Sequence, residues 1–499
     1  MLEKYYEDLR KRENLREALQ SLRGQAKDSV RRQELAALAG DGTLLIGLLS
    51  EEDPKVRKNA ALLIGDLALS QAAEPLLTAY YRETTLFVKS AYLTALGKLD
   101  VSRYLDSFRT RMKELSEMTP AEDEKKHISE EIRELGKIIT KLEGTQKHVF
   151  TGFQKPRVIV LATGHDRRDV TLREVEGLPA RMVKKAAAHP LGVIVSAAEV
   201  KPLLDLRTYR ELLFPLHTRQ PVTRVPEQAA EEIWNSELWE LLRECHSEEA
   251  PFCFRLELRG KLEPSEKASF IKKLAARLEA ESCRKLINST GDYEAELRLY
   301  LNKQGNIVPF LKLYTIPMPR FSYRKNAVAM SIHPSAAAML VRLAQPCLKR
   351  GARVLDPFCG VGTMLIEREM LVPAAEKYGI DIFGEAVKLG RENAAAAGVQ
   401  IRFIQRDYFD FTYDGKFDEI ITNLPVRGKQ SKEEMDAFYA AFFKKSKRLL
   451  APGGVLIFYS NEEGFVKKQL RLHTGYKLLQ QFVVQEKNHF CLYIVGMKG

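Results

Sequence analysis

The residues best suited to bind a small molecule are an aspartate and a glycine-rich turn in the C-terminal third of the sequence. Residues 352–367, ARVLDPFCGVGTMLIE, predict a buried strand, a turn at Gly360 and Gly362, and the start of a helix. In an open α/β sheet, ligands bind beyond the carboxyl ends of the strands, and glycine lets the backbone approach them closely. The pattern is not a dinucleotide-binding fingerprint, because Leu365 occupies the position of its third glycine. Asp356 would repel a pyrophosphate, but its carboxylate could bind an amino-acid ammonium group.

Three further apolar runs, each with a polar residue at its end, follow at the spacing of alternating strands and helices. An acidic residue after the second strand is suited to ribose hydroxyls, and one after the third could accept a hydrogen bond from an adenine amino group. Each residue taken singly could instead cap a helix or a turn. Because four strand ends carry such residues, the sequence predicts a cofactor site at one edge of a parallel sheet. The runs are 377–382 with Asp381, 401–407 with Asp407, and 417–429 with Asn423.

These segments resemble the class I S-adenosylmethionine-dependent methyltransferases, and within them the RNA guanine-N2 methyltransferases that carry a THUMP domain. The segments that carry the resemblance are YRKNAVAMSIHPSAAAMLVRLA (323–344), DPFCGVGTMLIE (356–367), YGIDI (378–382), RDYFDF (406–411) and TNLPVRGK (422–429).

The resemblance implies S-adenosylmethionine as the cofactor. Asp381 would then bind the ribose and Asp407 the adenine, while the glycine turn lines the methionine end. Asn423 and Pro425 would face the methyl acceptor. The implied cofactor-binding residues are Asp356, Phe358, Gly360, Gly362, Asp381, Asp407 and Asn423.

The tetrapeptide Asn423-Leu424-Pro425-Val426 suits methyl transfer to an exocyclic amine of a base, which is a poor nucleophile while its lone pair is delocalised into the ring. The amide oxygen of Asn423 and the carbonyl of Leu424 can accept both amine hydrogens, since Pro425 cannot continue regular structure. Holding the reacting atoms in line about 3 to 3.5 Å apart would supply much of the catalysis without a strong general base. The predicted catalytic residues are therefore Asn423, Leu424 and Pro425.

Val426 departs from the family pattern, which has an aromatic residue here that stacks on the extruded base. Such stacking is worth about 1 to 3 kcal/mol per base. Phe358 and Tyr459 are candidates to replace the missing ring, although Phe358 could equally pack in the core beside the cofactor. A degenerate enzyme that binds without turnover is the alternative.

The C-terminal region, residues 326–499, is expected to form a Rossmann-like methyltransferase domain with a seven-stranded, mostly parallel sheet. Helical segments of suitable length separate its strand-like runs. Residues 455–460 follow a Pro-Gly-Gly turn, and residues 481–486 and 490–496 predict a terminal hairpin whose last strand is antiparallel.

Residues 1–148 are rich in Leu, Ala, Glu, Lys and Arg with helical periodicity, which predicts an all-α region. Segments 53–68 and 85–100 align with a period of 32 residues, and the first resembles a HEAT repeat. Because two copies seldom form a stable α-solenoid alone, flanking helices are expected to cap the stack. A protein partner is the expected ligand here, since the charges of 122–144 are of mixed sign.

Residues 149–325 mix strand-like and helical segments and predict an α+β region. A hairpin is expected at 156–178, and a strand followed by a long basic helix at 251–281. Two more strands are expected at 292–301 and 306–316. The β-α-β-β order resembles a THUMP RNA-binding module.

If this module binds RNA, its basic residues would contact phosphates without reading sequence. A lone surface lysine is more often simply solvated. His333, which stands before Pro334, could merely begin a helix. The predicted RNA-contacting residues are Lys261, Lys272, Lys273, Arg277, Arg320, Arg324 and Lys325.

The composition favours a polyanionic partner and argues against several other classes of protein. The 499 residues include 78 Lys and Arg against 66 Asp and Glu, a net charge of +12, and their number predicts about three domains. Six cysteines without a Cys-x-x-Cys pair predict no metal site and are consistent with a reducing cytoplasm. No apolar run is long enough to span a membrane, and the charged N-terminus lacks a signal-peptide core.

The leading hypothesis is a cytoplasmic RNA methyltransferase that modifies the 2-amino group of a guanosine, with transfer RNA first and ribosomal RNA second as substrate. A DNA adenine or protein-amide methyltransferase is the alternative among enzymes, because the tetrapeptide suits any planar amine acceptor. A non-catalytic RNA-binding adaptor with a helical interaction platform is the alternative outside them. The sequence leaves open the target nucleotide, the number of methyl groups, the protein partner and the oligomeric state.

Overall fold

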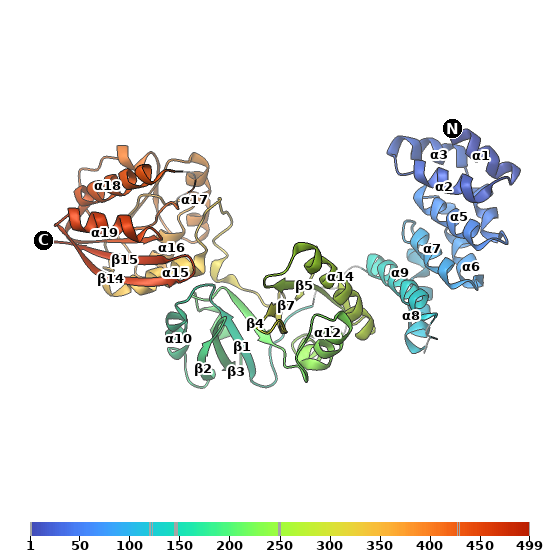
Figure 1. Ribbon diagram of the computed structural model, residues 1–499, viewed down its shortest axis with the longest axis horizontal. Helices are drawn as coiled ribbons and strands as arrows, with labels where there is room; N and C mark the ends of the chain where they lie inside the picture. The colour runs from blue at the N-terminus through green and yellow to red at the C-terminus, as the bar shows by residue number, and fades with distance from the viewer. Residues whose placement is uncertain are drawn as a thin grey trace. The chain divides into compact units, whose positions relative to one another are not determined.

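The chain divides into two compact units. Figure 1 colours its N-terminal helices blue and its C-terminal strands and helices orange to red. The first unit contains Met1–His148, Ala250–Cys253 and Lys273–Asp292, and the second contains Val149–Glu249, Phe254–Lys272 and Tyr293–Gly499. The computed structural model describes residues 2–118, 121, 123–143, 148–247, 251–426, 428 and 430–498.

The N-terminal part of the first unit is built of helices, as predicted, and its described residues up to 143 contain no strand. The two segments expected to repeat form α5 (Pro54–Asp66) and α7 (Leu86–Leu96), which pack against each other. A Cβ atom at Gly65 would lie 2.7 Å from the Ala95 Cα, so glycine permits this close approach of the helices. The other helices are α1 (Leu2–Lys11), α2 (Leu15–Gln25), α3 (Ser29–Ala39), α4 (Thr43–Gly47), α6 (Ala73–Arg82), α8 (Leu105–Glu117) and α9 (Lys125–Glu143).

The middle of the chain contributes an eight-stranded sheet with the strand order β2-β3-β1-β4-β8-β7-β5-β6. The strand and long helix expected at 251–281, and the strands expected at 292–301 and 306–316, are confirmed. The strands are β1 (Arg157–Ala162), β2 (Val183–His189), β3 (Gly192–Ala197), β4 (Glu211–Pro215), β5 (Phe252–Arg259), β6 (Leu286–Asn288), β7 (Ala295–Leu301) and β8 (Ile307–Leu313). The helices are α10 (Arg168–Glu176), α11 (Lys201–Leu204), α12 (Pro226–Ile233), α13 (Trp239–Glu244) and α14 (Pro264–Glu281).

The hairpin expected at residues 156–178 is wrong. The first run is β1, but the second is α10, and β1 pairs with β3 and β4 instead. The buried side chains of α10 are Val170, Thr171 and Val175, a spacing that suits one face of a helix and not the alternation of a strand. The hairpin of this region is β2 with β3, and β2 lacks a sequence signal because none of its side chains is fully buried.

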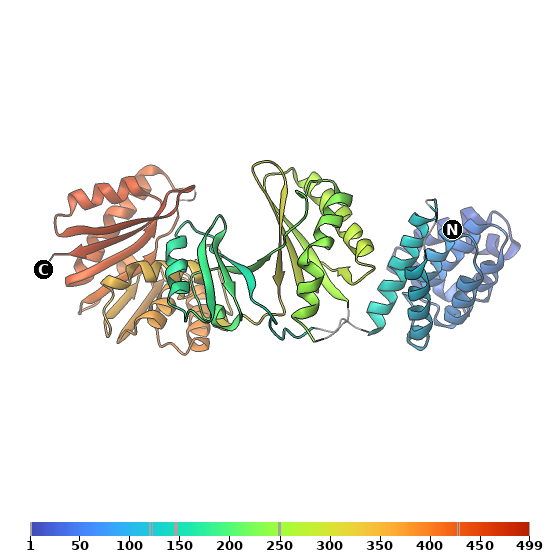
Figure 2. The ribbon, with the colours of Figure 1, turned by 90° about the horizontal axis from the view of Figure 1, so that it is seen from below.

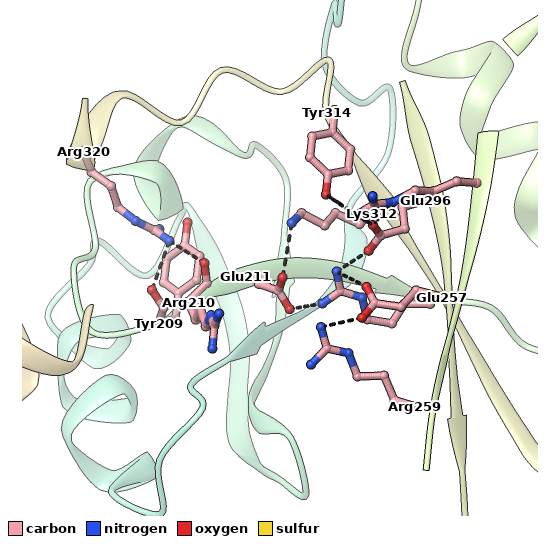
Figure 3. Close-up of polar contacts among 11 residues, drawn as sticks. Tyr209, Arg210, Glu211, Glu257, Arg259, Glu296, Lys312, Tyr314 and Arg320 are labelled. Carbon is pink, nitrogen blue, oxygen red and sulfur yellow. Dashed lines mark hydrogen bonds and ion pairs between the residues drawn. The ribbon is translucent and has the colours of Figure 1, made fainter. Parts of the chain in front are cut away.

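Ion pairs reinforce the junction between the two halves of the eight-stranded sheet, where β4 and β8 share only two residue pairs. Arg298 on β7 has a side chain 2% exposed and pairs with Glu211 on β4, with Glu296, and with Glu257 at 3.2 Å. Figure 3 shows Lys312 reaching Glu211 across the junction, at 3.2 Å. Because both ion-pair partners of Glu211, Arg298 and Lys312, lie across the junction, its charge is compensated only when the two halves meet.

The C-terminal region forms a second sheet, with the order β11-β10-β9-β12-β13-β15-β14. Strands β11 to β13 of this order pair in parallel, whereas β15 is antiparallel to both of its neighbours. The predicted seven-stranded sheet, its terminal hairpin and its final antiparallel strand are confirmed. The strands are β9 (Arg353–Asp356), β10 (Glu376–Asp381), β11 (Arg402–Gln405), β12 (Phe417–Asn423), β13 (Leu450–Ser460), β14 (Tyr476–Gln485) and β15 (Phe490–Met497).

Helices cover both faces of this sheet, as Figure 2 shows. Leu355 and Val354 are neighbours on β9 and point into two different apolar cores, one with α18 and α19 and the other with α15 and α16. The near-continuous apolar runs of β9 and β12 follow from this burial on both faces. The helices are α15 (Pro334–Ala344), α16 (Thr363–Leu371), α17 (Gly384–Ala396), α18 (Lys432–Leu449) and α19 (Glu463–Leu472).

A buried carboxylate fastens the middle region to the C-terminal domain within the second unit. Glu367 on α16 is 2% exposed. It accepts two hydrogen bonds of 2.8 Å from the guanidinium of Arg207 and one of 2.6 Å from the hydroxyl of Tyr323. A second pair, between Arg342 of α15 and Glu174 of α10, measures 2.7 Å. Since a buried charge without a partner is costly, these contacts determine how the two parts meet.

We expect Arg207→Met to lower the free energy of unfolding by about 3 to 5 kcal/mol, because the Glu367 carboxylate would stay buried without its cation. Urea unfolding followed by circular dichroism measures the change. The matched control is Arg173→Met, which removes a side chain that is 65% exposed and 3.0 Å from Asp169. The control should change stability by about 0.5 kcal/mol or less. Equal losses in both variants would contradict the role given to Glu367.

Candidate cofactor and acceptor site

A cavity of about 760 Å³ lies at the carboxyl ends of β9, β10, β11 and β12. Its volume is within the range of about 300 to 1,000 Å³ that is usual for cofactor and small-molecule pockets. Of the predicted cofactor and catalytic residues, only Gly362 is not at its wall. The lining residues come from segments 328–332, 356–364, 381–386, 406–409 and 423–426.

The glycine turn gives the cavity an open backbone wall. Gly360 has a φ of +51°, and no atom lies within 4 Å of the place where its Cβ would be. Gly362 has a φ of +80° and begins α16, and a Cβ there would lie 2.8 Å from the Phe403 ring. Both positions therefore require glycine, the first for its conformation and the second also for packing.

Asp381 at the end of β10 and Asp407 after β11 each cap a turn and also face the cavity. Asp381 accepts hydrogen bonds from the backbone N–H groups of Gly360, at 2.8 Å, and Phe383, at 2.9 Å. Asp407 accepts one from the Phe409 N–H at 2.8 Å. Both side chains are half-buried and line the cavity. Their capping role thus leaves carboxylate lone pairs available for a ligand.

Asp356 is the most buried acid of the cavity, at 1% exposed. Its carboxylate accepts a hydrogen bond of 3.1 Å from the Phe358 N–H. Burial raises the pKa of Asp356 to about 7, and the neighbouring Asp381 carboxylate adds to the rise, while the hydrogen bond from the Phe358 N–H opposes it. A bound cation would favour the ionised form of this carboxyl.

The acceptor tetrapeptide begins where β12 ends. Asn423 is the last residue of β12, and the N–H of Leu424 donates to the Tyr459 carbonyl at 3.1 Å. Leu424 is buried, whereas Pro425 is exposed and Val426 half-buried. Among the described residues, none forms a hydrogen bond with the side-chain amide of Asn423. The amide therefore has its full hydrogen-bonding capacity for a ligand in the cavity.

The two rings proposed to replace an aromatic residue at Val426 lie in different places. Phe358 lines the cavity and contacts four other rings, at centroid distances between 5.5 and 6.4 Å. Tyr459 is buried against Phe490, with ring centroids 4.9 Å apart, and is not at the cavity wall. Phe358 is thus the better placed of the two, as both a packing ring and a wall of the cavity.

Sequence reasoning missed three apolar side chains that line the cavity although they are exposed. Phe383 is 71% exposed, and Ile382 and Met330 are exposed as well. Exposed apolar surface of this kind suits the planar face of a base. The signal that could have revealed Ile382 and Phe383 is their position directly after Asp381, where a strand end should turn polar.

The seven residues predicted to contact RNA differ in exposure. Arg324 is half-buried. Arg320 is buried and donates hydrogen bonds to the carbonyls of Leu206, Tyr209 and Arg210, at 3.0 to 3.2 Å, as Figure 3 shows for the last two. Arg320 therefore holds the segment before β4. The exposed residues of the set are Lys261, Lys272, Lys273, Arg277 and Lys325.

His333 begins a helix, as its position before Pro334 suggested. Its Nδ1 accepts a hydrogen bond of 3.2 Å from the Ser335 N–H at the start of α15. Over the described ranges, no cluster of three or more His, Cys, Asp or Glu side chains is placed to hold a metal ion. None of the described helices is long and apolar enough to cross a membrane.

Comparison with known proteins agrees with this geometry. Residues 322–489 match the RMKL-like methyltransferase domain family, UPF0020. A tRNA (guanine(10)-N2)-dimethyltransferase of Methanothermobacter thermautotrophicus is 29% identical over 155 residues, 30% of this chain and 45% of the relative. A tRNA (guanine(6)-N2)-methyltransferase of Thermus thermophilus is 32% identical over 168 residues, 33% of this chain and 49% of the relative. The chain thus spans about half the length of these relatives.

A solved structure shares the fold over a larger part of the chain. The structure of SMU.472, assigned as a methyltransferase and complexed with SAH, has a TM-score of 0.51 and 16% sequence identity. The similarity covers 70% of this chain and 99% of that chain. The methyltransferase fold predicted for the C-terminal domain is confirmed by these comparisons.

We expect the affinity for S-adenosylmethionine to rise with pH between about 5.5 and 7.5. Below its pKa of about 7, Asp356 is protonated and cannot pair with the ammonium of the predicted cofactor. Affinity should therefore fall by up to about tenfold for each pH unit below 7. Isothermal titration calorimetry across this range makes the measurement. In Asp356→Asn the dependence should be flat, with weak binding throughout, and a wild-type profile in this variant would contradict the assignment.

Proposed function

We propose that this chain is an S-adenosylmethionine-dependent RNA methyltransferase that methylates the exocyclic N2 of a guanosine, in transfer RNA first and ribosomal RNA second. The observation that carries the proposal is that residues 423–425 share one cavity with the aspartates that end β9, β10 and the turn after β11. The named activities of the two relatives, both guanine-N2 methylations of tRNA, support the same substrate class.

The cavity residues fit S-adenosylmethionine, which would supply the methyl group. Asp381 presents carboxylate oxygens suited to ribose hydroxyls, and Asp407 an oxygen suited to an adenine amino group. Ile382 and Phe383 offer exposed apolar surface for the adenine ring. Asp356 lies in the same wall beside Gly360 and would hold the ammonium.

The contribution of this chain to methyl transfer is to orient the amine of the acceptor base. The Asn423 amide oxygen and the Leu424 carbonyl would accept the two amine hydrogens, so that the nitrogen lone pair points into the cofactor end of the cavity. Burial of Leu424 and its hydrogen bond to Tyr459 fix the backbone that presents both acceptors. The site would therefore catalyse the reaction by positioning the acceptor amine, and not by abstracting a proton from it.

The proposal assigns supporting roles to the rest of the chain. Residues 149–325 would form a THUMP-like RNA-binding region, and residues 326–499 the catalytic domain. The N-terminal helices, residues 1–148, would form a HEAT-like platform for a protein partner. The packing of α5 on α7 supports this role, since the matched segments form a close helix pair. We place the protein in the cytoplasm.

The test is transfer of labelled methyl groups from S-adenosylmethionine to total RNA from cells that lack this protein, followed by nucleoside analysis. Labelled N2-methylguanosine is the expected product. Label found only in DNA or in protein would show that those molecules, and not RNA, are the methyl acceptors. RNA binding of normal strength without any transfer would instead indicate a non-catalytic adaptor.

Asn423→Ala should lower methyl transfer at least about 100-fold while leaving cofactor affinity near that of the wild type, because it removes one acceptor of the amine hydrogens. Single-turnover transfer and calorimetry measure the two quantities. Asn423→Asp is the matched variant, and it should keep measurable activity because a carboxylate still accepts hydrogen bonds. Intact turnover with weak cofactor binding in Asn423→Ala would contradict the role of the amide.

Val426→Tyr should strengthen binding of the acceptor base, since it adds a ring at a half-buried position of the cavity wall. We expect KM for RNA to fall about tenfold, the scale of one stacking contact. Steady-state kinetics with saturating cofactor measure the change. Val426→Leu, which adds apolar volume without a ring, is the control, and an equal gain in both variants would exclude stacking as the cause.

A further inference from the structure

Three arginines that have no carboxylate partner in the described part of the chain lie close to His333, within the second unit. The ring of Phe321, whose carbonyl accepts a backbone hydrogen bond of 3.0 Å from the Arg324 N–H, lies 6.1 Å from the His333 ring. The neighbouring Arg320 donates to the Arg210 carbonyl at 3.2 Å.

Burial, and then the charges of Arg210, Arg324 and Arg320, lowers the pKa of His333 to about 4. Among the described residues, none of these arginines forms an ion pair. By contrast, the half-buried Arg207 of the same unit pairs with the Glu367 carboxylate. The cluster therefore carries an uncompensated positive charge.

Arg320 contributes charge to this cluster but cannot itself bind a ligand. Its guanidinium donates to three backbone carbonyls and lies over the Tyr209 ring, 3.6 Å from the ring centroid. Figure 3 shows it held against Tyr209 and the Arg210 backbone. Its role is to fix the segment that presents the side chain of Arg210.

Arg210 and Arg324 are the two members of the cluster with free donors. The Nε of Arg324 is buried and has no acceptor among the described residues. Arg210 is exposed, and its Cδ lies 3.6 Å from the place where a Cβ at Gly164 would be. The neighbouring acid, Glu211, already pairs with Arg298 and with Lys312, the second of which Figure 3 shows. Glu211 therefore does not compensate the charges of Arg210 and Arg324.

The cluster lies next to one wall of the cavity along the chain. Arg324 precedes, and His333 follows, the segment 328–332 that forms one wall of the cavity. Because Nδ1 of His333 accepts the N–H at the start of α15, the neutral ring carries its proton on Nε2, as a further donor. Donors of Arg324 and His333 therefore flank a segment of the cavity wall along the chain.

We propose that Arg210 and Arg324 form an anion site that binds a backbone phosphate of the RNA, beside the nucleotide whose base occupies the cavity. A guanidinium binds phosphate through paired donors, and a partly desolvated cation gains more from such an anion than a solvated one. The inference rests on the proposed function, because it assumes an RNA substrate.

The test measures RNA affinity apart from turnover. The probe is deproteinised transfer RNA from cells that lack this protein, bound at several salt concentrations. Arg210→Gln and Arg324→Gln should each weaken binding about fivefold or more and lower the slope of log affinity against log salt by about one. Cofactor affinity, measured by calorimetry, should stay within about twofold. Arg324→Lys, which keeps the charge but not the paired donors, should keep the wild-type salt slope and lose less affinity than Arg324→Gln.

The matched control is Arg219→Gln, which removes the same charge from an exposed position in the turn after β4. If Arg210→Gln binds RNA as Arg219→Gln does while the wild type methylates RNA, the anion site is refuted and the proposed function stands. If the wild type neither binds nor methylates RNA, the proposed function fails and the inference fails with it. Loss of affinity in the cluster variants alone supports the site.

Discussion

The buried carboxylate of Glu367 is the constraint on which the arrangement of the second unit depends. Its partners Arg207 and Tyr323 come from the loop before β4 and from the segment that enters the C-terminal domain. Glu367 itself lies on α16, the helix that begins at the glycine turn of the cavity. The hydrogen-bonded carboxylate of Glu367 therefore fixes the middle region, the connecting segment and the cofactor wall relative to one another.

The elements of the C-terminal domain could be predicted because local sequence decides them. Apolar runs buried on both faces, each followed by a polar residue, predict parallel strands whose ends meet at one edge. Asp381 and Asp407 show that a polar residue at a strand end can cap a turn and line a cofactor site at the same time. Each caps a turn, and the same cap holds its carboxylate at the cavity wall.

The rest could not be predicted because it depends on partners distant in sequence. Arg207 and Glu367 are separated by 160 positions, and no local pattern connects them. In the sequence Arg320 resembles a surface cation in a basic run. In the structure it is buried and donates hydrogen bonds to backbone carbonyls of the segment before β4. Similarly, β2 follows no apolar alternation, because its position depends on pairing with β3 and not on burial of its own side chains.

The Glu367 contact also limits how the domains of such a chain can be exchanged. A chimera that joined this catalytic domain to a foreign middle region would keep the acid on α16 but lose the guanidinium that faces it. The cost of an unpaired buried charge, about 3 to 5 kcal/mol, is a large part of the stability of a typical domain. Exchange of one region without this cost therefore requires that the arginine, the tyrosine and the glutamate be kept together, although the chain spreads them over three separate segments.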